Sequence, residues 1–510
     1  MVSIQPTYFV IGFKILGEVC KKKMSTKHRR MICWIGTCCI LYLLGMNVNS
    51  TSAATTDTSV ITTVTGEGHT IESGDDANTV EQEKTDSGEV LPDQQATVET
   101  EGTEDAEGEE LNQEYTGKVI LSMEKVFLQQ GESCKLEVTL TEANLSGENI
   151  KYKSSKKNII TVSQEGVIKA IHWGEANVTV SLGDTKAVCK VTVTKDVHIT
   201  ISAAGDCTFS SDIKQPSGIN FFSVYNKQKD NAYFFKNVKS IFEQDDMTII
   251  NFEGTLSNRG SRVEKQWAFR GKPAYIDILK EGSIEAVAFA NNHVRDYGEV
   301  SYTDTINGFD KADIAYSSYS KIGIYEAQGI RIGMISIQET GVSNSADILR
   351  RALKTIKKKE PDLLVVSFHW GIERTSSATK SQINLSRIAI DEGDADLVLG
   401  HHPHVLQPIE KYKDSYIVYS LGNFCFGGNT NPPDKDTIIY KQTFTFHNDQ
   451  LVPDDNVSVI PCSVSSVSTK NNYQPTPSTG SEKTRILKRM NSYCKQYGIL
   501  FDKKGKVKVQ

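Results

Sequence analysis

The sequence predicts an α/β fold that follows a small all-β domain, and two patterns carry this prediction. Apolar and polar residues alternate with a period of two in short runs between Lys118 and Lys195, for example in Ala176–Val180. After Asp196, strand-type runs alternate with helix-type runs, as in proteins whose helices cover a sheet. We therefore expect two folded parts, residues 116–196 and 197–450, and a C-terminal extension with one helix over residues 451–510.

The first 50 residues have the composition of a targeting segment. They carry seven basic side chains and one acidic side chain, and an uncharged, largely apolar run from Met31 to Met46 follows the basic cluster. About 20 apolar residues span a bilayer, whereas the core of a cleavable signal has roughly 7 to 15, so a membrane anchor and an export signal both fit. Either alternative places the rest of the chain outside the cytoplasm, anchored to the cell membrane or secreted to the cell surface.

Residues 51–115 are expected to form a disordered acidic linker. Between residues 57 and 114 there are 18 acidic side chains and one basic side chain, and residues 51–114 contain no aromatic residue and no cysteine. Such a segment buries too little apolar surface to offset the entropy of ordering. The remainder of the chain is close to neutral, which argues against a nucleic-acid-binding protein, since that class presents a strongly basic surface.

The all-β part is predicted to be an immunoglobulin-like sandwich, because its short strands are separated by glycines. Its segments Val126–Gly131 and Gly166–Val180 resemble the bacterial Ig-like group 2 domain, which implies a spacer or adhesive unit without chemistry of its own. Cys134 and Cys189 each alternate with apolar residues, so both thiols are expected to point inward. They form a disulfide or remain two buried thiols, since the sequence does not fix the pairing.

The α/β part contains the elements that would carry a site. Its strand candidates are His198–Ala204, Met247–Asn251, Ile284–Ala290, Arg331–Ile337, Leu363–His369, Asp396–Gly400 and Tyr416–Leu421. Its helix candidates are Phe234–Gln244, Asp304–Lys311, Ala346–Lys358, Gln382–Glu392 and, near the C terminus, Ser481–Tyr497. In α/β folds ligands gather at the carboxyl ends of strands, so the residues that follow these strands are the candidate site.

Polar residues cluster where the predicted strands end. The clusters are Gly205-Asp206, Asn251-Phe252-Glu253, Asn291-Asn292-His293, His369-Trp370-Gly371, His401-His402-Pro403-His404 and Gly422-Asn423, and they hold five of the ten histidines. Unpaired polar groups are costly to bury, so we interpret these clusters as a metal site. Imidazole and carboxylate ligands together favour Mn, Fe or Zn over Mg, and Glu253 or Asp206 could bridge two divalent ions.

The paired histidines of the last cluster are expected to act together. In an extended segment, side chains two residues apart project to the same side, so the rings of His402 and His404 would lie together. By the same argument His401 would point the other way, as a bystander.

These motifs resemble those of the capsule synthesis protein CapA family, also described as poly-γ-glutamate capsule biosynthesis proteins, within the calcineurin-like metallophosphoesterase superfamily. The resemblance extends from about Thr200 to His447. Besides the strand-end clusters, it includes the segments Phe269–Pro273, Ala290–Gly298, His369–Glu373, Gly400–Val405 and Ser420–Phe424. It implies a four-layer α/β/β/α sandwich with the site at one edge of the sheets.

The resemblance also implies roles for individual residues. The metal ligands would be Asp206, Glu253 as the bridging carboxylate, Asn292, His369, His402 and His404. His293 would protonate the leaving oxygen. Arg270 is a candidate for binding an anionic group, with a surface ion pair as the alternative. Asn291 and Asn423 are further candidates for substrate binding.

Two departures from the superfamily bear on activity. Thr208 stands where the first motif usually has a histidine, and Asn251-Phe252-Glu253 replaces the usual Gly-Asp pair, so one metal position would be weaker, vacant or differently filled. The leading expectation is a metal-dependent, phosphoesterase-like hydrolase that acts on an anionic cell-envelope polymer. The alternative is a polymer-binding accessory subunit of a membrane capsule synthase complex, without turnover of its own.

Overall fold

The structure is a computed structural model that describes residues 118–509, apart from residues 142–149, 215–219 and 320. The predicted anchor and the whole of the predicted acidic linker lie outside the described residues. In the described part of the chain, no helix is both long enough and apolar enough to cross a membrane.

Residues 118–195 form the predicted all-β sandwich. One sheet has the strand order β2-β9-β8-β5, a second has the order β3-β7-β6, and β1 pairs with β4. The strands are β1 (Val119–Leu121), β2 (Lys125–Gln129), β3 (Ser133–Lys135), β4 (Val138–Leu140), β5 (Lys151–Ser154), β6 (Ile160–Val162), β7 (Val167–Ala170), β8 (Gly174–Leu182) and β9 (Thr185–Thr194). Cys189 is buried in the core of the sandwich, and the half-buried Cys134 packs against this core. Both cysteines are free thiols and do not form a disulfide.

The α/β part is built on two sheets that pack face to face. The first has the order β15-β14-β11-β10-β23-β25-β26, with β22 paired to β10 and β24 to β23. Its strands are β10 (Asp196–Thr208), β11 (Met247–Phe252), β14 (Ala286–Phe289), β15 (Ala315–Ser318), β22 (Asn423–Phe426), β23 (Asp436–His447), β24 (Gln450–Val452), β25 (Val457–Ser463) and β26 (Thr476–Pro477). The second has the order β16-β17-β18-β19-β21-β20, with strands β16 (Gly323–Ala327), β17 (Ile330–Gln338), β18 (Leu363–His369), β19 (Leu397–His401), β20 (Ile409–Tyr412) and β21 (Ser415–Val418).

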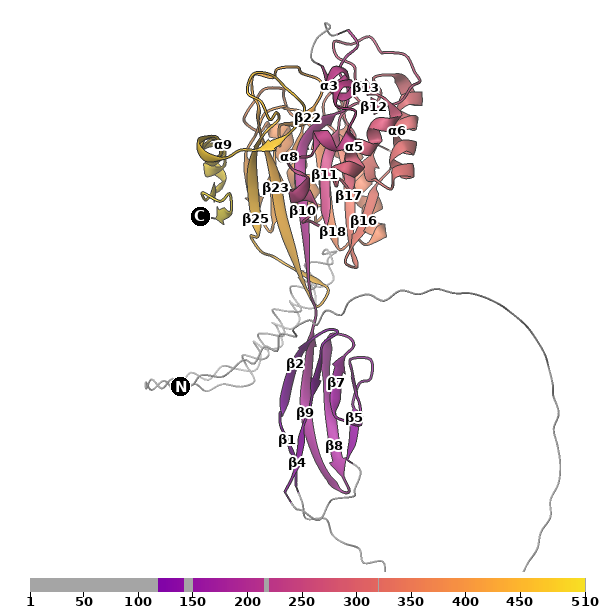
Figure 1. The fold of residues 1–510 in the computed structure, drawn as a ribbon, viewed down its shortest axis with the longest axis vertical. Coiled ribbons are helices and arrows are strands. Elements are labelled where there is room, and N and C mark those ends of the chain that lie inside the picture. Colours follow the sequence, from indigo (N-terminus) through magenta and orange to yellow (C-terminus); the bar gives the residue numbers. More distant parts are fainter. Residues whose placement is uncertain (1–117, 142–149, 215–219, 320, 510) are drawn as a thin grey trace, which may run out of the picture. The chain divides into compact units, whose positions relative to one another are not determined.

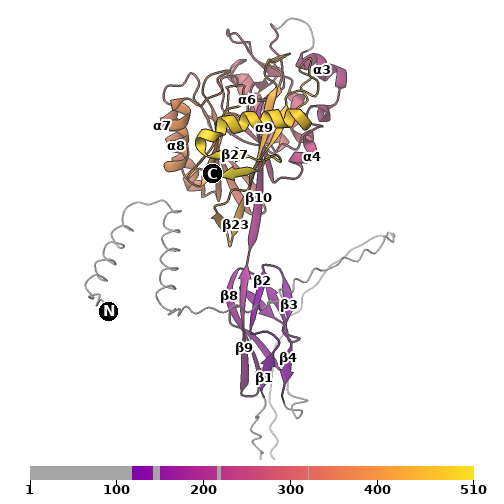
Figure 2. The ribbon, with the colours of Figure 1, turned by 90° about the vertical axis from the view of Figure 1, so that its left-hand side faces the viewer.

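Helices cover the outer faces of both sheets, which gives the predicted α/β/β/α order. They are α3 (Phe221–Gln228), α4 (Lys239–Phe242), α5 (Asp277–Glu281) and α6 (Gly298–Ala312) on the first sheet, and α7 (Ser345–Ile356) and α8 (Lys380–Asp391) on the second. Figure 1 shows α6 along one flank of the sheets, and Figure 2 shows α7 and α8 on the opposite flank from α3 and α4. Apolar residues of both sheets, such as Ile201, Val365 and Leu399, form one buried cluster between the sheets.

Three features differ from the sequence predictions or extend them. The predicted helix Phe234–Gln244 is reduced to the single turn of α4. The reason is that Phe234, Phe235 and Phe242 all pack into one aromatic core beneath the first sheet. The boundary expected at residue 450 falls inside the first sheet, since β25 pairs antiparallel with β23. The helix α9 (Gly480–Cys494) buries Ile486 and Met490 in the cluster between the sheets, in agreement with the predicted C-terminal helix.

Candidate metal centre

The polar strand ends gather at one edge of the two sheets. β10, β11 and β14 are parallel neighbours in the first sheet, as are β17, β18 and β19 in the second, so within each sheet their carboxyl ends lie together. A register shift between Ala204 and Asp206 interrupts β10 near its carboxyl end. A Cβ atom at Gly205 would lie 1.9 Å from the carbonyl oxygen of Gly422, so only glycine permits this approach. The Asp206 amide donates to the same oxygen over 2.9 Å, which fixes the position of its carboxylate.

Asp206, Glu253 and His369 form an inner set of candidate ligands. One atom from each, a carboxylate oxygen or an imidazole nitrogen, lies within 4.8 Å of the other two, and all three side chains are buried. Asn292 adjoins this set, because its Oδ1 atom lies 2.9 Å from Nε2 of His369. Two carboxylates, an imidazole and an amide oxygen are ligands that divalent transition metals accept.

Glu373, His402 and His404 form an outer set by the same 4.8 Å criterion, with Glu373 exposed to solvent. His404 joins the two sets. Its Nδ1 lies 3.2 Å from Oδ2 of Asp206, and its Nε2 lies 3.9 Å from Oε1 of Glu253. The rings of His369 and His402 also approach, with centroids 4.8 Å apart. The structure therefore brings the six predicted metal ligands to one place and adds Glu373 to them.

The two paired histidines meet in a turn and not in the extended segment that we expected. His402 and His404 both have left-handed backbones, with φ of 92° and 57°. Residues other than glycine are strained in this region, and such strain persists only where the surroundings enforce it. Here the His402 amide donates to Oδ2 of Asp206 over 3.3 Å, and the Arg374 amide donates to the Pro403 carbonyl over 2.7 Å.

The prediction that His401 points away from the site was wrong. Its side chain is buried and its Nδ1 lies 3.4 Å from Oδ1 of Asp206. The reason is that His401 is still part of β19, where it pairs in register with His369 of β18. Residues in register on parallel strands project to the same face of the sheet, so the side chains of His401 and His369 lie on the same face. The turn after β19 then brings His402 and His404 to the same place.

Burial and neighbouring charges set the pKa values of the cluster. Burial lowers the pKa of His369 well below its ordinary value and that of His402 to about 4, so both rings are neutral near pH 7, as metal ligands must be. Burial raises the pKa of Glu253 to about 8. Burial opposes the charges of both His404 and Asp206, but their surroundings outweigh it. Nearby Glu253 and Asp206 raise the pKa of His404 to about 9. The nearby imidazoles of His401 and His404 hold the pKa of Asp206 well below its usual range.

Unsatisfied polar atoms point to a cation at this place. Among the described residues, Oε1 of Glu253 and Nδ1 of both His401 and His402 are buried without a hydrogen-bond partner. A buried polar atom left unpaired costs about 1–3 kcal/mol, and each of these atoms is a lone-pair donor. A divalent metal ion would satisfy them, so the residues present fit a metal centre.

His293 lies beside the cluster with one ring nitrogen held by a carboxylate. Its Nδ1 lies 2.6 Å from Oδ2 of Asp296, whose other oxygen accepts from Nζ of Lys265 over 2.7 Å. Its Nε2 lies 3.6 Å from Oε1 of Glu253. Burial lowers the pKa of His293, partly offset by the hydrogen bond to Asp296. This arrangement orients the ring and directs Nε2 towards the metal ligands.

Three asparagines brace the ligands. Nδ2 of Asn251 donates to Oδ1 of Asp206 over 2.8 Å and lies 3.4 Å from Nδ1 of His369. Asn291 fixes the orientation of that amide by donating to Oδ1 of Asn251 over 3.2 Å and to the Phe252 carbonyl over 2.8 Å. Asn423 contacts Nδ1 of His404 through its Oδ1 at 2.9 Å. Asn291 and Asn423, the predicted substrate-binding amides, thus direct their polar atoms to protein groups.

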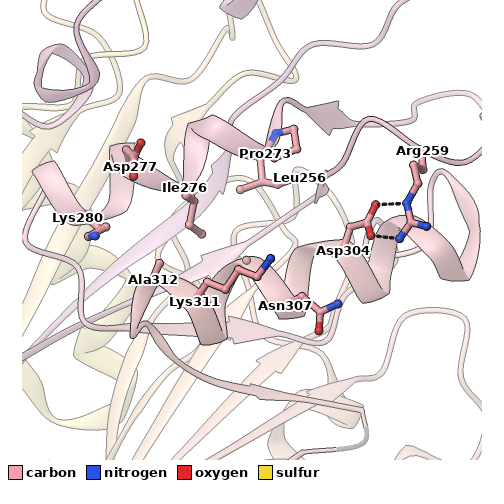
Figure 3. A pocket seen from close by; sticks show the side chains of 11 residues that line it. Leu256, Arg259, Pro273, Ile276, Asp277, Lys280, Asp304, Asn307, Lys311 and Ala312 are labelled. Atoms are coloured by element: carbon pink, nitrogen blue, oxygen red, sulfur yellow. Dashed lines mark hydrogen bonds and ion pairs between the residues drawn. The ribbon is translucent and has the colours of Figure 1, made fainter.

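Arg270 faces a different part of the surface. Its guanidinium donates to the carbonyls of Arg259 and Gly260 and lies 4.0 Å above the ring of Tyr297. The neighbouring Arg259 lines a pocket of about 520 Å³ between α5 and α6, where it pairs with Asp304 (Figure 3). The residues of this pocket include none of the candidate metal ligands.

Sequence reasoning missed three contributors to the site. Glu373 and Asp296 both lie within motifs that carried the family resemblance, four and three residues after a predicted site histidine. Asn251 was noted as part of a strand-end cluster but was given no role. The signal for each was its place in a polar motif, but only contacts across the sheets reveal which polar residues point inward.

Comparisons with known proteins relate both folded parts of the chain to described families. Residues 200–428 match the family described as bacterial capsule synthesis protein PGA_cap, and residues 116–194 match the bacterial Ig-like domain (group 2). The chain is 29% identical over 284 residues to the capsule biosynthesis protein CapA of Bacillus anthracis, covering 50% of this chain and 67% of that protein. It is 30% identical over 247 residues to the PGA biosynthesis protein CapA of Bacillus subtilis (strain 168), covering 43% of this chain and 65% of that protein.

The alignments therefore span about two thirds of the length of these curated relatives. Among solved structures, the chain is similar to the calcineurin-like phosphoesterase YfkN from Bacillus subtilis, with 13% identity and a TM-score of 0.35. That similarity covers 58% of this chain and 97% of the other.

Proposed function

We propose that the protein acts outside the cytoplasm on an anionic cell-envelope polymer or on the linkage of that polymer. The proposal starts from the match of residues 200–428 to the bacterial capsule synthesis family. The action would take place at a two-metal, hydrolase-type centre. The observation that carries this proposal is the position of His404, whose two ring nitrogens face Asp206 and Glu253 while its neighbour His402 faces His369. Two adjoining ligand sets linked by the contacts of one residue, here His404, offer places for a pair of ions.

We assign the metal ligands as Asp206, Glu253, Asn292, His369, His402 and His404. A pair of divalent ions, Mn, Fe or Zn by the mixture of imidazoles and carboxylates, supplies Lewis acidity and lowers the pKa of water at such a centre. Glu253 is the bridging candidate, because its carboxylate lies near Asp206 and His369 on one side and near His404 on the other.

His293 is the proposed proton carrier. Because Asp296 accepts a hydrogen bond at Nδ1, Nε2 is the ring atom free to exchange a proton with a reacting oxygen. Phe269 packs on the ring with centroids 4.6 Å apart, which limits access of water from that side. Asn291, Asn251 and Asn423 hold the surrounding groups in place, and Arg270 supports the loop that lines the neighbouring pocket.

The proposal is tested on the purified full-length protein by metal analysis and by hydrolysis of a model phosphodiester with added Mn²⁺. We expect bound transition metal in the wild type, less metal in Asp206→Ala and His402→Ala, and hydrolysis that depends on the metal. A wild-type protein that binds no transition metal would contradict the proposed centre.

A second candidate function is supported by one residue. Thr208 occupies the place of a histidine ligand in the wider superfamily, and its hydroxyl is buried without a hydrogen-bond partner among the described residues. If one ion is held too weakly for turnover, the domain binds the polymer as an accessory subunit of a membrane synthase complex. Binding of an anionic polymer such as poly-γ-glutamate, without hydrolysis under any divalent metal, would favour this candidate.

A further inference from the structure

Glu373 ends the motif His369–Glu373, but no role is predicted for it from the sequence. It is the exposed residue of the outer set, and a carboxylate oxygen of Glu373 lies within 4.8 Å of a ring nitrogen of both His402 and His404. An exposed glutamate alone is unremarkable, because most glutamates are solvated. Here it faces two imidazoles, and Nδ1 of His402 is buried without a hydrogen-bond partner among the described residues.

The backbone holds Glu373 at this place. The segment that follows β18 is joined to the histidine turn by two hydrogen bonds, from the Trp370 amide to the His401 carbonyl (3.1 Å) and from the Arg374 amide to the Pro403 carbonyl (2.7 Å). Left-handed backbones at Gly371 and Arg374, with φ of 80° and 60°, bend the segment back towards the turn.

The side chains beneath this segment are also fixed. Trp370 is fully buried, and its Nε1 donates to the Tyr419 carbonyl over 2.8 Å. The Gly371 amide donates to Oε2 of Glu339 over 3.2 Å. These contacts hold the backbone on both sides of Glu373, and so they fix the position from which its side chain extends.

We propose that Glu373 is the third protein ligand of the outer metal position, together with His402 and His404. This inference rests on the proposed two-metal function and deepens it. Two imidazoles and one carboxylate make a site for a divalent transition metal, which would take its remaining ligands from solvent or from the substrate. The carboxylate lies on the solvent-exposed side of the cluster.

Exposure has a consequence for the behaviour of the two positions. The inner set is buried, whereas the outer set opens to solvent at Glu373. A metal ion held by the outer set would therefore exchange with solvent more readily, and an anionic group of the polymer would meet the outer set first.

The test is a Mn²⁺ titration of the full-length protein, in which free Mn²⁺ is followed by its electron paramagnetic resonance signal. The variants are Glu373→Gln, which keeps the size of the side chain and removes its charge, and Glu373→His, which offers an imidazole nitrogen as a ligand in place of the carboxylate. Glu326→Gln is the matched control, because Glu326 is an exposed glutamate on β16 that pairs with Arg331. Thermal unfolding of each metal-free variant checks that the fold is intact.

We expect two Mn²⁺ sites in the wild type and in Glu326→Gln. In Glu373→Gln the weaker site should lose at least about 10-fold in affinity, while the tighter site is unchanged, since loss of even an indirect contact to a metal costs about this much. Glu373→His should recover part of the loss. Two sites with unchanged affinities in Glu373→Gln would overturn the role of Glu373 and leave the two-metal proposal standing.

Other outcomes are equally decisive. A wild type that binds no Mn²⁺ would overturn the metal centre and the role of Glu373 together. If the wild type binds a single ion, weaker binding in Glu373→Gln would support Glu373 as a ligand, whereas unchanged binding would exclude it.

Discussion

Nδ1 of His404 lies 3.2 Å from Oδ2 of Asp206, although the two residues are positioned by strands of different sheets. Asp206 lies near the carboxyl end of β10 in the first sheet, and His404 belongs to the turn after β19 in the second. The contact places the candidate metal centre across the seam between the sheets. The centre therefore depends on how the two sheets pack.

Asn251→Ala should weaken metal binding without removing a ligand. The amide of Asn251 donates to Asp206 and lies beside His369, so its loss frees both side chains to move. Loss of such a supporting contact lowers metal affinity by about 10- to 100-fold. Mn²⁺ titration measures the change, and Asn307→Ala, at an exposed position on α6, is the control. Equal affinities in both variants would show that Asn251 does not position the ligands.

Asp296→Asn should impair hydrolysis more than metal binding. Asp296 orients His293 through the contact to Nδ1, and a positioned acid or base contributes about 10²- to 10⁴-fold to turnover. We expect His293→Ala to lose activity in this range, Asp296→Asn to lose a smaller part, and both to bind Mn²⁺ as the wild type does. His198→Ala changes an exposed histidine on β10 and should leave activity intact. Full activity in His293→Ala would remove His293 from the mechanism.

Gly205→Ala should destabilise the fold and disturb Asp206. The added methyl group would lie 1.9 Å from the Gly422 carbonyl oxygen, so strands β10 and β22 must separate, at a cost of about 1–3 kcal/mol or more. Thermal unfolding and Mn²⁺ titration should both show a loss. Gly308→Ala is a matched control on α6, where no atom lies within 4 Å of the added methyl group, and it should stabilise the helix by about 0.5–1 kcal/mol. A Gly205→Ala protein as stable as the wild type would contradict the close approach.

Asp436→Asn should loosen the attachment of α9 in a pH-dependent way. Asp436 is buried and binds Arg485 and Arg489 of α9. Burial opposes its charge, but the hydrogen bonds from both arginines outweigh burial and lower the pKa of Asp436. The loss of these bonds should reduce the free energy of unfolding by about 1–3 kcal/mol at pH 7.

The sign of the pH effect follows from the lowered pKa of Asp436. The contribution of its carboxylate is complete above the pKa of the unfolded state, about 3.9, and is lost as the pH falls through the lower value of the folded state. The difference in unfolding free energy between wild type and Asp436→Asn should therefore shrink below about pH 4. Urea unfolding at pH 7 and pH 3 measures it, with Asp347→Asn on the exposed face of α7 as the control. A difference that is the same at both pH values would contradict the ion-pair explanation.

Much of the fold could be predicted because local patterns carry it. Each predicted strand of the α/β part overlaps an observed strand, since buried parallel strands are continuous apolar runs. The segment from Phe234 to Gln244 misled the prediction, because its closely spaced phenylalanines resemble one face of a helix but fill an aromatic core. β23 and β25 were both missed, and they become recognisable as strands of the first sheet through their antiparallel pairing with each other.

The sequence by itself determined the chemistry available to this protein: which polar residues follow strands, and that imidazoles, carboxylates and amides occur there in the order of the capsule synthesis family. It did not determine which of them face one another. His401 and Glu373 show this most clearly, since one was expected to point away and the other was assigned no role. Their positions depend on the register between β18 and β19 and on a strained left-handed turn. Register and turn strain are set by contacts between segments far apart in the chain, so only the tertiary structure decided which side chains form the centre.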